Sequence, residues 1–385
     1  MLPSLIRSLS SRIAHSSGRR LGLAVLPLVA LGVVSTPAQT AGPWHLRLAA
    51  SASSRYDDNI LSLSDRDQAR LKDPVLRNSD RFRIESEDDV ILIPRATLRL
   101  ERSPRRGRET AFSVSARAFD YQRNSVKDFQ EYVFTFRQEL NVSRRHLSTV
   151  SAGFSHIPRF YLRQLVDDDA SLAAGMTVRN SADYARNRAF FRYSQEILNR
   201  TLSVAGTYAR ERRNYNDNFN ERDANSDVSG VRFTYFPLHR NRLRIRPYYE
   251  HERRGSRGDL GSTAVVDDDV AFSSDLFGVD VRWLWGHDAH HRRSVTLWFN
   301  NEDRDFGTSN VMDTGHFGRS DDIDQIGATY GFELGPVWKV DLGYRYRNND
   351  LSLPGALGGT TITSFSKNVF TATLRYRFRF HRAAS

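Results

Sequence analysis

The chain has 385 residues, a formal net charge of +11, no cysteine and 11% aromatic residues, with a mean hydropathy of −0.54. This polarity argues against a bundle of membrane-spanning helices, and the lack of cysteine excludes disulfides and thiolate metal sites. The basic charge alone would suit nucleic acid, but the export signal described next argues against that partner.

The N-terminus has the pattern of a secretory signal peptide. Four arginines and no acidic residue precede an apolar run over 21–34, and small residues follow at 35–38. The run is shorter than the about 20 residues that a spanning helix needs. We therefore predict a cleaved signal peptide over residues 1–38 and a single mature domain over 39–385, with an uncleaved N-terminal anchor as the alternative.

From residue 44 to residue 380 the sequence repeats one unit, in which about ten alternating apolar and polar residues are followed by a connector. The connectors alternate between short turns and long polar segments, as in outer-membrane barrels. We predict an all-β fold, an antiparallel transmembrane β-barrel of about 14 strands with short periplasmic turns and long extracellular loops. The predicted strands are 44–56, 89–101, 110–121, 130–142, 147–156, 187–198, 201–212, 228–237, 242–252, 275–285, 293–302, 323–334, 337–348 and 368–380. The predicted long loops are 57–88, 157–186, 213–227, 253–274, 303–322 and 349–367.

One face of these strands carries aromatic residues at both ends and aliphatic residues between them. In the last strand, for example, Leu374 and Tyr376 alternate with Arg375 and Arg377. Two aromatic belts around an aliphatic band match the two interfaces of a membrane, whereas the core of a soluble β-sandwich, the alternative fold, has no reason to sort aromatics in this way. The predicted membrane-interface aromatics are Trp44, Tyr56, Tyr132, Tyr235, Tyr249, Trp283, Trp285, Trp338, Tyr344, Tyr376, Phe378 and Phe380.

The opposite face carries arginine on strand after strand. Without residues 1–38 the net charge is +7, and only four of the basic residues are lysine. Guanidinium groups stay charged at any working pH and bind carboxylate or phosphate through two hydrogen bonds. Because every backbone group must be paired in lipid, a sheet crosses only as a closed barrel, and its polar face then encloses water. The predicted lumen-lining residues are Arg95, Arg99, Arg117, Arg137, Arg192, Arg232, Arg244, Arg246, Arg282, Arg345, Arg347, Arg375 and Arg377.

The signal peptide, the alternating connectors and a last strand that ends on Phe380 resemble Gram-negative outer-membrane β-barrel proteins over the whole mature chain. More narrowly, the stretches YDDNI at 56–60 and YRYRNN at 344–349, with Phe378, are similar to barrels of the surface lipoprotein assembly modifier type and to barrels that accompany exopolysaccharide export. The five residues after Phe380 depart from the pattern, because such barrels usually finish on the aromatic that the assembly machinery recognises. The resemblance implies an outer-membrane location, contact with membrane lipid and lipopolysaccharide, and insertion by the barrel assembly machinery.

A charged lumen of this size is either an open conduit or a filled interior, because 14 strands lie between small packed barrels and open porins. Arginine exceeds acidic residues on the polar face, and such a field would concentrate anions. We predict a monomeric, porin-like or secretion-linked conduit for anionic solutes or polysaccharide. A translocation barrel for surface lipoproteins and a structural or adhesive barrel are the alternatives.

Other clusters of reactive residue types lack a recognisable site pattern. Acidic runs such as 57–58, 167–169, 267–269 and 321–322 fall in predicted long loops without the spacing of a calcium loop, so we interpret them as solvated charge. The turn with His287, His290 and His291 is too short and exposed to hold zinc in tetrahedral geometry. His251 and His156 are the nearest candidates for a catalytic base, without a nucleophile placed beside them. We therefore predict no enzymatic activity, no cofactor and no metal site.

Overall fold

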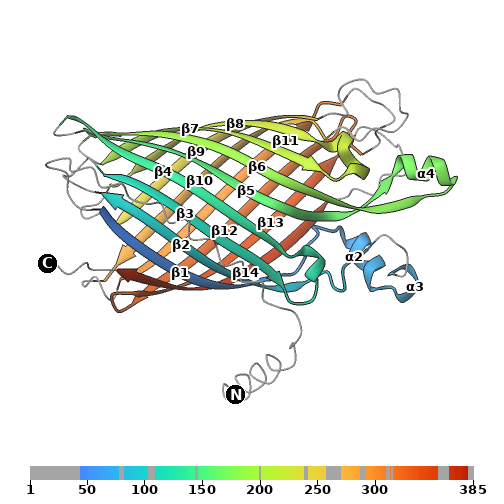
Figure 1. Ribbon diagram of the computed structural model, residues 1–385, viewed down its shortest axis with the longest axis horizontal. Helices are drawn as coiled ribbons and strands as arrows, with labels where there is room; N and C mark the ends of the chain where they lie inside the picture. Colours follow the sequence, from blue (N-terminus) through green and yellow to red (C-terminus); the bar gives the residue numbers. More distant parts are fainter. Residues whose placement is uncertain are drawn as a thin grey trace, which may run out of the picture. The chain divides into compact units, whose positions relative to one another are not determined.

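The computed structural model describes residues 44–77, 82–102, 109–143, 146–198, 201–237, 242–256, 270–286, 292–308, 313, 315–353 and 364–379. The predicted signal peptide and the uncleaved anchor considered beside it lie outside these residues. The described part of the chain forms a closed antiparallel barrel of 14 strands, in which each strand pairs with the next in sequence and the last pairs back with the first (Figure 1). The predicted fold class and strand number are confirmed. The strands are β1 (Trp44–Asp57), β2 (Asp89–Arg102), β3 (Thr110–Tyr121), β4 (Phe129–Ser143), β5 (His146–Asp167), β6 (Val178–Ile197), β7 (Leu202–Tyr215), β8 (Ala224–Tyr235), β9 (Leu243–Ser256), β10 (Phe272–Trp285), β11 (Arg293–Phe306), β12 (Ser320–Leu334), β13 (Trp338–Ser352) and β14 (Phe365–Arg379).

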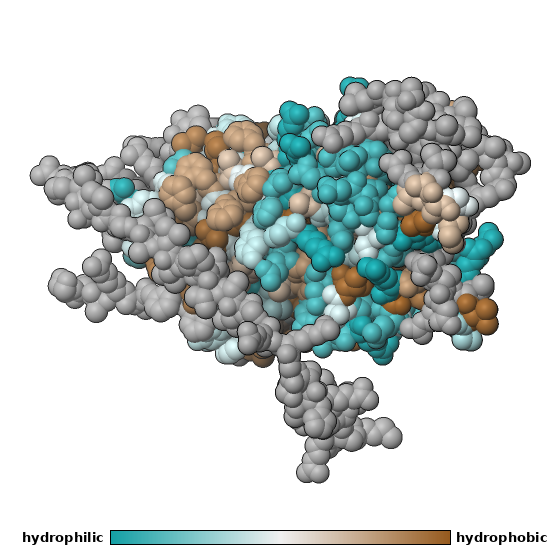
Figure 2. Space-filling view, turned by 45° about the vertical axis from the view of Figure 1, so that its right-hand side comes forward, coloured by the Kyte–Doolittle hydropathy of each residue, from teal (hydrophilic) through white to brown (hydrophobic). Residues whose placement is uncertain are grey.

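The outer wall of the barrel carries exposed apolar side chains at every second residue. Trp283 is 61% exposed, Leu297 is 55% exposed and Phe370 is 51% exposed, although large apolar side chains in water-soluble folds are mostly buried. Figure 2 shows apolar residues gathered mainly toward the short-turn end of the barrel and hydrophilic residues toward the other end. A continuous apolar belt around a closed sheet is the surface that a lipid bilayer requires.

Hydrogen bonds and an ion pair close the barrel where β1 meets β14. The strands pair from Arg47 opposite Arg379 to Asp57 opposite Val369. Beyond β1, the Asp58 carboxylate accepts the backbone N–H of Asn368 at 2.7 Å and its side-chain amide at 2.8 Å. The Lys367 ammonium lies 3.2 Å from the Asp57 carboxylate. The acidic run at 57–58 is therefore bonded across the seam, and its interpretation as solvated charge was wrong.

The first long connector folds into a small core rather than an open loop. It contains α2 (Asp65–Lys72) and α3 (Pro74–Arg77), and the Ser64 hydroxyl caps α2 by accepting the backbone N–H of Asp67. Leu71 of α2 is 2% exposed. The connector packs on inward residues of β2, β3 and β5, in a cluster of Ile60, Leu61, Leu63, Leu71, Ile84, Ile91, Ile93, Phe119, Tyr121 and Tyr161. No helix in the described part of the chain is long and apolar enough to cross a membrane.

The second long connector was predicted wrongly. The segment 157–186 continues the pairing of β5 with β6 from Ile157 opposite Arg186 to Asp167 opposite Val178, with two register shifts. The hairpin ends in α4 (Asp168–Ala174), whose N-terminal N–H of Ala170 is capped by the Asp167 carboxylate at 2.8 Å. It projects beyond its neighbours at the end of the barrel that carries α2 and α3 (Figure 1). The prediction assumed strands of membrane length, whereas backbone pairing extends wherever two segments stay in register.

Candidate functional site: the inner wall of the barrel

Strand register places the predicted arginines on the inner wall, opposite to the apolar belt. On β13 the exposed Leu342 and Tyr344 alternate with Gly343 and Arg345, and the same alternation runs around the barrel through the paired strands. The predicted aromatics with described side chains occupy the outer positions. For Arg377 and Phe378 only the backbone pairing with Ala49 and Leu48 is described, and Phe380 lies outside the described residues.

Carboxylates neutralise many of these arginines. Asp280 on β10 accepts from Arg246 at 2.7 Å and from Arg244 at 3.3 Å, both on the neighbouring strand β9. Glu131, which is 4% exposed, accepts from Arg117 and from Arg186. Further pairs of the predicted arginines are Arg99 with Glu101 and Glu109, Arg137 with Glu139, Arg232 with Glu250, and Arg375 with Asp341. Some of these pairs lie within one strand and others join different strands, and together they remove much of the positive charge from the interior.

Five of the predicted arginines have no such partner. Within the described residues, no carboxylate oxygen lies within 4.0 Å of the guanidinium groups of Arg95, Arg192, Arg282, Arg345 and Arg347. Arg95 and Arg375 are exposed although they occupy inner positions, which requires free volume for water in front of them. The electrostatic neighbours of Arg95 are Arg117, Arg375 and Glu131. The inner wall therefore holds arginines without an ion-pair partner among the described residues, beside accessible space.

Arg192 on β6 is the centre of a larger basic cluster. Its electrostatic neighbours are Arg232, Arg246 and Arg137, which come from β8, β9 and β4. The residues that pair with Arg192 have short side chains. They are Ser151 on β5 and Thr207 on β7. Arg192 is half-buried. Because Arg137, Arg232 and Arg246 are paired with Glu139, Glu250 and Asp280, the charge that remains for an anion at this point of the wall is that of Arg192.

Three aromatic rings on the inner wall were not predicted. Tyr248, Trp298 and Phe190 each lie opposite a glycine of the adjacent strand, Gly278, Gly327 and Gly153. A Cβ atom placed on Gly327 would lie 2.4 Å from the indole of Trp298, and one on Gly278 would lie 2.3 Å from the ring of Tyr248. The rings therefore rest on the backbone of the barrel wall. In the sequence, each ring can be recognised as an aromatic residue at a position where the alternation of its strand predicts a polar one. The glycine opposite it can be identified only once the pairing register of the strands is known.

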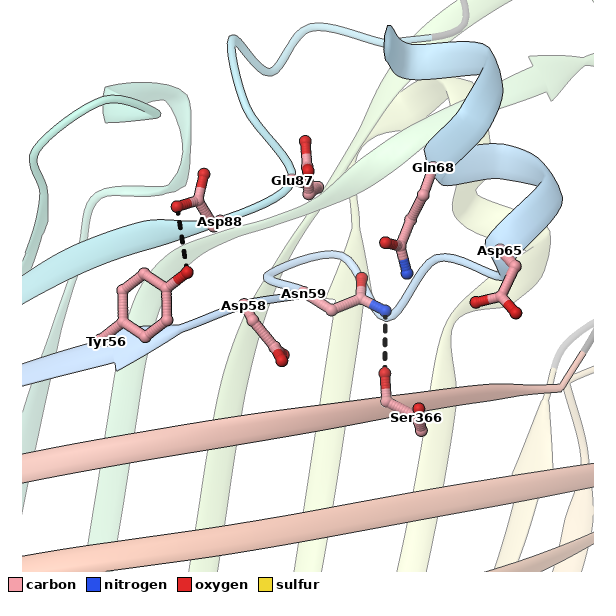
Figure 3. A pocket seen from close by; sticks show the side chains of 8 residues that line it. All are labelled: Tyr56, Asp58, Asn59, Asp65, Gln68, Glu87, Asp88 and Ser366. Atoms are coloured by element: carbon pink, nitrogen blue, oxygen red, sulfur yellow. Dashed lines mark hydrogen bonds between the residues drawn. The ribbon is translucent and has the colours of Figure 1, made fainter.

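A polar cavity of about 390 Å³ lies at the long-loop end of the barrel, between the end of β1, the first connector and β14 (Figure 3). Tyr56 donates to the Asp88 carboxylate at 3.2 Å across one side of it. Burial raises the pKa of Asp88, but the hydrogen bond from Ser86 and the charge of Arg123 outweigh burial, so the net pKa is lowered. The other lining residues are Asp58, Asn59, Asp65, Gln68, Glu87 and Ser366. The rim is thus acidic where the inner wall is basic.

The two histidines considered as catalytic bases, His251 and His156, each contact a side chain of an adjacent strand. His251 faces outward and its Nδ1 lies 2.9 Å from the Asp275 carboxylate, whereas the adjacent Glu250 and Glu252 face inward. The Nδ1 of His156 pairs with the side chain of Asn187 at 2.8 Å. Among the described residues, no group of three or more His, Asp or Glu side chains is arranged to hold a metal ion. The cluster His287, His290 and His291 and the acidic run 267–269 lie outside the described residues.

Comparison with known proteins finds no matching family model and no matching curated protein. Solved structures with a similar arrangement include an anion-selective porin from Comamonas acidovorans, with 11% identity, a TM-score of 0.39 and coverage of 87% of this chain and 99% of that chain. The outer membrane channel DcaP of Acinetobacter baumannii has 10% identity, a TM-score of 0.43 and coverage of 89% and 99%. A Pseudomonas aeruginosa FadL homologue has 11% identity, a TM-score of 0.43 and coverage of 86% and 90%. The closed antiparallel barrel of 14 strands is itself the fold that the sequence resemblance implies.

Proposed function

We propose that the chain is a monomeric outer-membrane conduit that admits and concentrates anionic solutes. The observation that carries this proposal is the set of inner arginines that have no carboxylate partner among the described residues, above all Arg192. Fixed positive charge within a low-dielectric wall attracts anions from solution and repels cations. Paired arginines contribute little to this field, so selectivity depends on the unpaired ones.

Planar-bilayer recordings on the purified mature protein test the proposal. In a KCl gradient the reversal potential should show preference for chloride, and Arg192→Gln and Arg95→Gln should each shift it toward zero. Arg293→Gln is the matched control, because Arg293 is an exposed arginine on the outer wall at the short-turn end of β11. Preference for potassium, or the absence of any conductance, would overturn the proposal.

A second candidate cargo is an anionic saccharide. The inner rings of Tyr248, Trp298 and Phe190 lie on the same wall as the arginines, and an aromatic face beside guanidinium groups suits the apolar face and the carboxylate of a uronic acid. Oligomers of galacturonate should then block the current at lower concentration than neutral maltodextrins of equal length. Trp298→Ala should weaken the block by galacturonate without changing the preference for chloride, and an equal block by both oligomers would exclude this cargo.

A further inference from the structure

Three arginines project from the outer wall at the long-loop end of β7 and β9. Arg210 and Arg212 alternate with the buried Ala209 and Glu211 on β7, and Arg253 occupies an outward position on β9. All three side chains are exposed. Within the described residues, no carboxylate oxygen lies within 4.0 Å of their guanidinium groups. They differ in this from the ladder arginines of the inner wall.

Strand register brings these arginines into one patch, which we call the outer basic patch (Arg210, Arg212 and Arg253). Asp227 on β8 lies directly opposite Arg210 on one side and opposite Arg253 on the other. The Asp227 carboxylate accepts the hydroxyl of Tyr208 at 2.5 Å and forms no ion pair with either arginine. The patch therefore keeps a net positive charge on a surface three strands wide.

The position of the outer basic patch along the strands matches the level of lipid headgroups. Tyr208 and Tyr249 belong to the aromatic belt at this end of the barrel, and Arg210 and Arg212 follow Tyr208 by two and four residues on the same face. With a rise of about 3.3 Å per residue and a tilt of about 45°, they lie roughly 5 to 10 Å beyond the ring. This is the depth of the headgroup region, which extends roughly 5 to 8 Å beyond the hydrocarbon on each side of a bilayer.

The same end of the outer wall is acidic on the neighbouring strands. Outward positions of β10, β11 and β12 are occupied by Asp275, Asp303, Asp305, Asp322 and Asp324. Anionic headgroups that surround the barrel are therefore attracted to β7–β9 and repelled from β10–β12.

We propose that the outer basic patch binds the phosphate groups of a phosphorylated glycolipid in the outer leaflet. Each guanidinium group donates two parallel hydrogen bonds to a phosphate, and the tyrosine belt below contacts the sugar and the first methylene groups of the acyl chains. The occupant is a lipid rather than a soluble anion, because the patch adjoins the apolar belt directly. The site is independent of the conduit proposed above.

Native mass spectrometry of the mature protein, purified in detergent and incubated with diphosphoryl lipid A, tests this site. Each single substitution of Arg210, Arg212 or Arg253 by glutamine should weaken retention about fivefold, and the triple variant should weaken it about 100-fold. Lipid A retention by the triple lysine variant should lie between that of the single and that of the triple glutamine variants, because lysine keeps the charge but loses the paired donors. Monophosphoryl lipid A should bind more weakly than the diphosphoryl form.

Arg293→Gln, on the outer wall at the opposite end, is the matched control and should retain lipid A like the parent. The mobility shift between heated and unheated samples on gels shows that each variant is folded. Equal retention by the parent and the triple glutamine variant would overturn the proposal, and so would an equal loss in Arg293→Gln. Displacement of lipid A by inorganic phosphate at equal concentration would overturn the lipid as occupant in favour of a soluble anion.

Discussion

Replacing Lys127 by methionine should remove a dependence of stability on pH. Lys127 lies in the short helix η1 (Ser125–Lys127) between β3 and β4 and is 4% exposed. Its ammonium group donates to the carbonyl oxygen of Tyr161 at 3.3 Å and lies 5.3 Å from the ring centre of Phe160. Burial, with the nearby charges of Arg163 and Lys367, lowers the pKa of Lys127 to about 7.

The sign of the effect follows from proton binding in the two states. Between pH 7 and the ordinary lysine pKa of 10.5, unfolded Lys127 holds a proton that folded Lys127 has released, so the free energy of unfolding rises with pH. Each pKa unit corresponds to about 1.4 kcal/mol, and the full shift corresponds to roughly 5 kcal/mol over this window. Tyr161, whose pKa burial raises to about 12, opposes the trend only near and above pH 10, the pH at which an unfolded tyrosine is half ionised.

Urea unfolding of the barrel in detergent micelles, followed by tryptophan fluorescence at pH 7, 8 and 9, measures this slope. We expect the parent to gain about 1.4 kcal/mol per pH unit beyond what Lys127→Met gains, and Lys127→Met to be the more stable protein at pH 7. Lys72→Met is the control, because Lys72 is an exposed lysine paired with Glu87 at 2.9 Å and should keep the parent slope. The reasoning is refuted if Lys127→Met and the parent show the same slope.

Three further changes test the packing of the barrel. Gly327→Val should displace the Trp298 indole from the barrel wall, because a Cβ atom on residue 327 would lie 2.4 Å from the ring. We expect a lower single-channel conductance and a destabilisation of about 1 to 3 kcal/mol, measured by urea unfolding. Unchanged conductance and stability would contradict the contact between Gly327 and Trp298. Leu71→Ala removes a side chain that is 2% exposed and should destabilise the first connector by about 2 to 5 kcal/mol, so that limited proteolysis cuts within 57–88 faster while the strands stay intact. Asp58→Ala removes two hydrogen bonds to Asn368 at 2.7 and 2.8 Å and should speed amide exchange at the β1–β14 seam, whereas uniform exchange around the barrel would show that the seam is not a weak point.

Alternation along the strands was enough to predict the barrel and its faces. Leu374 and Tyr376 on β14 fall on the outer wall and Arg375 on the inner wall, because the side-chain period of a strand is two and lipid excludes charge from one face. The lengths of the strands were predicted less well. The segment 157–167 stays in β5, past the strand end predicted at residue 156, since backbone pairing and not hydrophobicity decides where a hairpin ends.

The sequence by itself determined which residues lie on the apolar face of the barrel wall and which lie on the polar face, since side chains alternate between the two faces of a strand. Only the tertiary structure decided which inner arginines are neutralised and which remain free. Arg246 lies beside Asp280 and Arg192 lies beside other arginines, although both look alike in sequence. Cross-strand register sets these neighbours, and register depends on the closure of all 14 strands rather than on any one of them.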